Sequence, residues 1–76
     1  MITINIRKEA GVFAENKDVA GRLRDTVLLP ALRQTNEVRI DFTGVEGATQ
    51  SFVHALISEA LREFGFFLRR AVMLAI

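Results

Sequence analysis

The chain has 76 residues, with ten Lys and Arg against nine Asp and Glu, one His and no Cys. A chain of this length forms one domain with a small core, and the absence of Cys excludes disulfides and thiolate metal sites. The basic residues are spread along the sequence and no carboxylate spacing supports a metal, so neither nucleic-acid binding nor a metal or cofactor is expected.

Hydrophobic residues make up 50% of the chain, and the mean hydropathy is +0.25. A chain this short has much surface, so a second copy or a partner is expected to cover some of the apolar area. The N-terminus alternates polar and apolar residues, unlike a signal peptide, and no run approaches the ~18 apolar residues of a membrane span. A soluble, cytoplasmic protein is expected.

The N-terminal residues are expected to form an edge strand, because a period of two gives one buried and one polar face. The alternating apolar residues are Ile2, Ile4 and Ile6. Residues 8–15 contain Gly11 and are expected to form a loop or a short second strand. Val12 and Phe13 would anchor this segment to the core.

A helix is predicted next, with Asn16 or Asp18 as its N-cap. Its apolar residues recur at three- and four-residue spacing: Val19, Ala20, Leu23, Val27 and Ala31. Gly21 weakens the helix, and Pro30 removes a backbone donor and clashes with the preceding turn. We therefore expect a kink near Leu28 or a break into two short helices.

Residues 34–36 end this helix, and residues 37–42 are predicted to be a strand. The apolar residues Val38, Ile40 and Phe42 alternate with charged ones, and a helical pattern lies on each side in sequence, which favours an α/β sheet.

The segment after this strand combines turn residues with an acidic strand end, and it is the place where a site is expected. Asp41 ends the strand where open α/β sheets often bind ligands, or it accepts backbone hydrogen bonds from the turn. Thr43 and Gly44 leave the strand in a turn. Glu46 follows, and Gly47 gives the loop freedom to reach positive φ. These glycines have the wrong spacing for a phosphate-binding loop.

The second helix has a broad apolar side and a polar stripe of Ser51, His54, Ser58 and Arg62. The apolar side consists of Phe52, Val53, Leu56, Ile57, Ala60, Leu61 and Phe64. Thr49 or Ser51 is expected to cap the helix, and Gly65 to stop it. Residues 66–70 are expected to be a connector, and the apolar residues 71–76 a buried strand.

The order of these elements, and above all the segment LLPALRQTNEVRIDFTGVEGATQSFVHAL, resembles the STAS-like domains of unknown function. That family is related to the sulfate-transporter and anti-sigma-factor-antagonist (STAS) domains, and the resemblance runs from about residue 20 to 70. It implies a small α/β domain with a mixed sheet and helices packed on one face. Residues 1–76 would form a single domain that lacks the usual C-terminal helix.

In the STAS antagonists, a GHKL-type kinase phosphorylates a serine at the start of the corresponding helix. Ser51 matches this serine, Gln50 takes the place of a preceding serine and Thr49 that of an aspartate, while Phe52 replaces a following glycine. Ser51 is therefore either a phosphoacceptor or a helix cap. His54 lies three residues after Ser51, but no acid is placed to orient it, so an enzyme is not expected.

The expected function is that of a non-enzymatic regulatory module resembling the anti-sigma-factor antagonists. Residues 43–54 would dock a protein partner, by resemblance a GHKL-type ATPase or kinase. One alternative is a domain that senses a nucleotide or other small ligand near Asp41 and Gly44. A second alternative is a structural subunit of a homo-oligomer, in which another copy covers the apolar C-terminal run.

Overall fold

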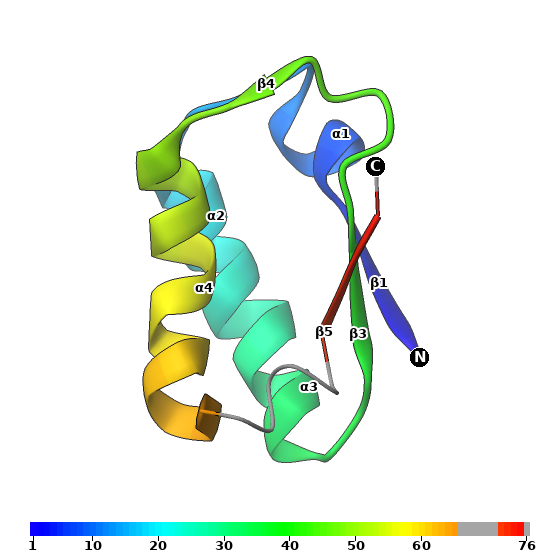
Figure 1. Ribbon diagram of the computed structural model, residues 1–76, viewed down its shortest axis with the longest axis vertical. Helices are drawn as coiled ribbons and strands as arrows, with labels where there is room; N and C mark the ends of the chain where they lie inside the picture. Colours follow the sequence, from blue (N-terminus) through cyan, green and yellow to red (C-terminus); the bar gives the residue numbers. More distant parts are fainter. Residues whose placement is uncertain (66–71, 76) are drawn as a thin grey trace.

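Helices and parallel strands alternate in the computed structural model (Figure 1), which describes residues 1–65 and 72–75. The larger sheet consists of β1 (Ile2–Asn5), β3 (Val38–Asp41) and β5 (Val72–Ala75), in the order β1-β3-β5. A second, shorter sheet pairs β2 (Phe13–Ala14) with β4 (Gly47–Ala48). The α/β class is confirmed. Every pairing among the described strands is parallel rather than mixed, because helical connections return the chain to the same end of the sheet.

The core lies between the larger sheet and the helices, which cover one face of the sheet as expected (Figure 1). β3 is the central strand, and its Val38 and Ile40 side chains are fully buried. β1 lies at the edge, as predicted, and its Ile4 pairs with Ile40. On the opposite face Thr3 and Arg39 are exposed to solvent. The alternation in β1 and β3 therefore separates a helix-covered face from a polar one.

A short helix, α1 (Ile6–Ala10), occupies part of the segment that we expected to be a loop or strand. The Asn5 side chain caps α1 by accepting a hydrogen bond from the Lys8 amide at 3.1 Å. Ile6 is buried as expected, but from this helix rather than from β1. The strand expected nearby is β2, although the predicted anchor Phe13 is 61% exposed. Ala14 is buried instead, because successive strand residues point to opposite sides.

The first long helical stretch consists of α2 (Lys17–Leu23), η1 (Arg24–Leu28) and α3 (Leu29–Arg33). Asn16 is the N-cap, and its side-chain oxygen accepts the Asp18 amide at 2.8 Å. The stretch ends at Gln34, and Thr35 adopts a positive φ of 59°.

We expected a kink or a break near Pro30. The helical stretch instead continues past this residue, with a π-helical turn just before it. In η1 the Leu29 amide donates to the Arg24 carbonyl five residues earlier, and Pro30 then lies in the first turn of α3, where its missing donor is tolerated. The wider turn shifts the buried face by one position. Leu28 is therefore fully buried, while Val27, predicted on that face, is only half-buried.

The second long helix, α4 (Gln50–Phe64), packs its apolar side against the core. Its buried residues are Phe52, Leu56 and Ala60. Leu61, predicted on the same side, is 52% exposed, because it lies farther around the helix toward solvent. Gly65 ends α4 with a positive φ of 54°, as predicted. No helix among residues 1–65 and 72–75 is long and apolar enough to cross a bilayer.

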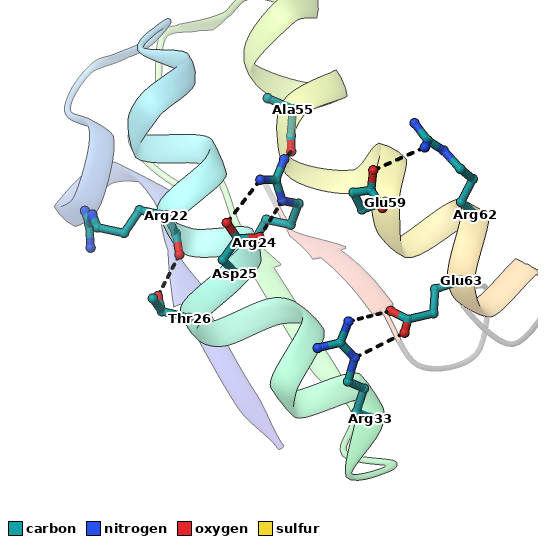
Figure 2. Close-up of polar contacts among 9 residues, drawn as sticks. All are labelled: Arg22, Arg24, Asp25, Thr26, Arg33, Ala55, Glu59, Arg62 and Glu63. Carbon is teal, nitrogen blue, oxygen red and sulfur yellow. Dashed lines mark hydrogen bonds and ion pairs between the residues drawn. The ribbon is translucent and has the colours of Figure 1, made fainter.

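Arginine side chains fasten α4 to the first helical stretch (Figure 2). Arg33 of α3 makes two hydrogen bonds to the Glu63 carboxylate, at 3.1 and 3.2 Å. Arg24 of η1 pairs with its neighbour Asp25 and also donates to the backbone carbonyl of Ala55 at 3.1 Å. Because these contacts lie at different levels along α4, they fix its rotation against η1 and α3.

The C-terminal strand predicted within residues 71–76 is present as β5, whereas residues 71 and 76 and the predicted connector 66–70 lie outside the described residues. Its burial differs from the expectation, since Leu74 is 68% exposed. β5 is the last strand of the sheet as described, so nothing in the described structure covers this side of Leu74.

Two phenylalanines predicted to be apolar anchors differ sharply in burial, which gives a matched test of the packing. Phe52 is fully buried and Phe13 is 61% exposed. Phe52→Ala should lower the free energy of unfolding by about 3–5 kcal/mol, since it leaves a cavity. Phe13→Ala should lower it by less than about 1 kcal/mol. Urea unfolding followed by circular dichroism measures both, and equal losses would contradict the packing described.

Candidate functional site

The predicted site lies at the end of the domain where β1 and β3 finish (Figure 1, top). From Asp41 the chain turns, crosses this end as β4 and enters α4. The start of α2 lies at the same end. The sequence therefore places residues 41–54 where loops and helix starts gather at the carboxyl ends of parallel strands.

Asp41 and Thr43 shape the turn that leaves β3. An Asp41 side-chain oxygen accepts a hydrogen bond from the Thr43 amide at 2.8 Å. Hydrogen bonds from Thr43, first from its hydroxyl and then from its amide, lower the pKa of Asp41, and the charge of Arg39 contributes less. Asp41 thus takes the second of its two predicted roles in this structure, that of a turn acceptor.

The two glycines of the loop have different tasks. Gly44 adopts a φ of +83°, and a Cβ there would lie 3.5 Å from the Arg7 side chain. Gly47, which we expected to use positive φ, is instead a strand residue of β4 with an ordinary backbone. A Cβ on Gly47 would lie 3.4 Å from the Phe13 ring. Gly47 is therefore explained by a close neighbour rather than by a turn.

Backbone hydrogen bonds tie this loop to β2. The exposed residue Glu46 donates its amide to the Val12 carbonyl at 2.8 Å, and the Thr49 amide donates to the Ala14 carbonyl at 3.0 Å. The parallel pairing of β2 with β4 lies between these two bonds. The loop is thus held in one conformation by a segment more than thirty residues earlier in the sequence.

Thr49, rather than Ser51, caps α4. Its side-chain oxygen accepts the Phe52 amide at 3.1 Å, and its backbone is extended, as expected for an N-cap. Ser51 lies one residue inside the helix and is exposed. The sequence left both residues open as caps, and the structure assigns that role to Thr49.

Ser51 and its neighbours Gln50 and His54 line a shallow hollow with Ala55 and Lys17. Lys17 begins α2, so the hollow lies between the starts of two helices. The three predicted residues are therefore brought together, while Asp41 ends β3, and Thr43 and Gly44 lie in the turn between β3 and β4.

Lys17 and Phe13 were not predicted as site residues. Lys17 is adjacent to Ser51 only because α2 packs against α4, and no local pattern signals this packing. Phe13 was assigned to the core from its hydrophobicity, but its ring lies on Gly47 at the surface.

The chemistry available in the hollow is that of hydroxyl, amide, imidazole and ammonium groups. Ser51 and His54 are both exposed on an open helix surface, and the described lining residues include no carboxylate that would orient the imidazole. Within the described residues, no group of His, Asp and Glu is placed to hold a metal ion. The hollow thus presents hydrogen-bonding groups and the positive charge of Lys17 at the surface.

The assignment of the cap predicts different outcomes for two similar substitutions. Thr49→Ala should lower the free energy of unfolding by about 1 kcal/mol, because it removes the acceptor of the Phe52 amide. Ser51→Ala should change it by no more than about 0.5 kcal/mol. Chemical denaturation of both variants tests this, and a larger loss for Ser51→Ala would identify Ser51 as the cap.

The lowered pKa of Asp41 predicts a pH dependence of stability. A carboxyl group with a lower pKa in the folded state stabilises the fold above its ordinary pKa, and this contribution is lost as the pH falls through the folded pKa. Stability should therefore decline as the pH drops below 3.8, the ordinary value for Asp41. Asp41→Asn should make this decline shallower. Hydrogen bonding to Arg24 also lowers the pKa of Asp25, so some dependence should remain.

Carboxyl carbon chemical shifts followed by NMR would give the Asp41 titration directly. A midpoint at or above 3.8 would contradict the hydrogen bonding of the turn.

Comparison with known proteins supports the resemblance inferred from the sequence. Residues 19–72 match the family described as STAS-like domain of unknown function. The match begins in α2 and ends at the first residue of β5, so it includes β3, the loop and all of α4. No curated protein and no solved structure matches the chain. Because the match spans most of the sequence, the protein belongs to the family of STAS-like domains of unknown function.

Proposed function

We propose that this domain is a non-enzymatic regulatory module that docks a protein partner through residues 43–54, with Ser51 as a phosphorylation switch. What supports this is the position of Ser51. Its hydroxyl is exposed in the first turn of α4, while Thr49 makes the capping hydrogen bond. The fold therefore does not need Ser51 as a cap, and a kinase has access to it.

Hydrogen bonds and packing hold the surface around Ser51 to the rest of the domain, which favours specific recognition. The Thr49 amide is bonded to β2, and the Thr49 side chain fixes the first turn of α4. The buried Phe52 ring holds the same turn against the core. A partner that docks here orders few additional groups, so little of its binding free energy is lost to conformational entropy.

Electrostatics at this end of α4 allow a phosphate without unfolding the helix. A phosphate on Ser51 would add about 1.5 to 2 negative charges near the positive end of the helix dipole. Lys17 lines the same hollow and supplies a further positive charge. Phosphorylation would thus leave the domain folded and change only the charge and size of the docking surface. A partner that binds the unmodified surface would be released.

The kind of partner follows from the family resemblance. Ser51 matches the serine that GHKL-type kinases modify in STAS antagonists, so we assign the partner to the GHKL-type ATPases or kinases. An ATP-dependent partner is consistent with a cytoplasmic location. Three neighbours of Ser51 differ from the residues around the corresponding serine in the STAS antagonists: Thr49, Gln50 and Phe52. These differences would adapt the surface to a different member of that class.

Docking is preferred over sensing of a small ligand because of what the strand-end residues do. The Asp41 carboxylate accepts the Thr43 amide, and Gly44 lies under the Arg7 side chain. These groups hold the turn rather than face an open crevice. Residues 49–54, in contrast, are mostly at the surface.

A binding and modification experiment tests the proposal. Each purified GHKL-type ATPase of the same genome is incubated with the wild-type protein, with and without ATP. Intact-mass spectrometry should show one added phosphate on the wild type and none on Ser51→Ala. In biolayer interferometry, Ser51→Asp should weaken binding at least about tenfold, which corresponds to about 1.4 kcal/mol.

Ser58→Asp is the matched control, since it places the same charge on the same helix about two turns farther from the loop. It should bind as the wild type does. Equal binding by wild type, Ser51→Ala and Ser51→Asp would count against the switch, and an absence of binding across the whole panel would contradict the assigned class of partner.

A further inference from the structure

One flank of α4 carries an apolar row that the core covers only in part. Val53, Ile57 and Leu61 are four residues apart and line one shallow hollow on the helix surface. Val53 and Ile57 are half-buried, and Leu61 is 52% exposed. Ile57 lies midway in the row, so the row is symmetric about that residue.

A second apolar hollow lies beside β5. Phe42, Val45 and Leu74 line it, together with Glu46, Gly47 and Ala48. Leu74 is in register with Ile40, which is fully buried under the helices. Leu74 therefore points into the helix layer, and yet it is 68% exposed.

Val53 and Ile57 lie on the flank of α4 away from α2. Ala55 faces η1, since Arg24 donates to its carbonyl. Val53 and Ile57 are each two residues from Ala55, which rotates them about 200° around the helix to the opposite flank. α4 connects β3 to β5 and so lies over that half of the sheet. The apolar flank therefore borders the β5 edge.

The β5 edge of the sheet is itself open in the described structure, because β5 pairs with β3 on its inner side and is the last strand in the order. The strand reads VMLA and contains no charged residue. Proteins commonly protect such edges with charges, prolines or covering elements. The strand edge is uncharged, and the hollow on the neighbouring helix flank contains one charged residue, Arg62, beside its apolar row.

We propose that a second copy of this chain covers this side and forms a two-fold dimer. A two-fold axis perpendicular to the sheet would pair β5 with the β5 of the other copy in antiparallel orientation, so that one sheet runs through both copies. The same axis would place the two α4 helices antiparallel in one layer, with Ile57 near Ile57 and Val53 near Leu61.

A second copy can cover both the open edge of β5 and the apolar flank of α4, whereas a single peptide could cover them only in part. It supplies a strand edge for β5 and an apolar helix flank for α4, in the same two layers and at the same spacing. The symmetry of the row about Ile57 gives the self-complementary pattern of an isologous contact. The opposed helix dipoles attract, and the antiparallel order would place the two copies of Arg62, the charged residue that lines the hollow of α4, at opposite ends of the contact.

The dimer goes beyond the proposed docking function, and its contact borders the docking surface, because Gln50 and His54 line both the hollow around Ser51 and the hollow of the apolar row. Ser51 lies about 120° around α4 from Ile57, on the flank toward Lys17. Ser51 and Lys17 do not line the hollow of the apolar row, so these two residues stay outside the contact in both copies. Each dimer presents two docking surfaces, one on each side of the axis.

Sedimentation equilibrium of the purified chain tests the proposal. The wild type should sediment at twice its monomer mass of 8.5 kDa. Leu61→Glu and Leu74→Lys should each raise the dimer dissociation constant at least about tenfold, since they place charge in an apolar contact. Thr3→Glu is the control, because Thr3 is exposed on β1, at the opposite edge of the sheet, and it should remain dimeric.

A cross-link keeps the test decisive if a charged variant is poorly folded. The chain contains no Cys, so Ile57→Cys introduces a single thiol. A short bis-maleimide should join two copies of Ile57→Cys and should not join two copies of a Lys17→Cys variant. A monomer at all concentrations up to about 100-fold above the assay minimum would overturn the proposal, and so would a dimer that only Thr3→Glu dissociates.

Discussion

The burial of β3 between two parallel neighbours is the constraint on which the rest of the structure depends. β3 bonds to β1 on one side and to β5 on the other, and its Val38 and Ile40 fill the centre of the core. Parallel neighbours require crossover connections, so the chain passes twice through helices on the same face. This places the start of α2, the start of α4 and the loop after β3 together at one end. The candidate site is a consequence of that topology.

The sequence predicted the elements whose signal is local. The alternation in β1 and β3 and the apolar face of α4 identified strands and a helix, because each pattern is set by which residues face the core. The π-helical turn was missed, since a one-residue shift in a helix leaves a pattern close to that of an ordinary α-helix. The exposure of Phe13 was also missed, because hydrophobicity alone does not say which side of a two-residue strand is buried.

Only part of the candidate site was predicted, again because local sequence patterns do not show contacts between distant residues. Thr49 and Ser51 both satisfy the composition of a cap, and only the hydrogen bond to the Phe52 amide separates them. Gly47 satisfied the composition of a turn, but its role depends on Phe13, which is distant in sequence. Lys17 joined the site through helix packing that no local pattern records. In each case the role depends on a contact in the folded structure, and the sequence does not show which residue makes that contact.

The π-helical turn before Pro30 has a consequence for how the family's chains can vary in length. Surface loops absorb insertions and deletions, whereas η1 lies between two buried helical segments that must both face the sheet. Deleting one residue from η1 would restore an α-helical turn and rotate α3 by about 100° relative to α2. Leu32 would leave the core, and Arg33 would no longer reach Glu63. The fold therefore requires this number of residues between Leu23 and Pro30. Related chains should have the same number even where the residues themselves differ.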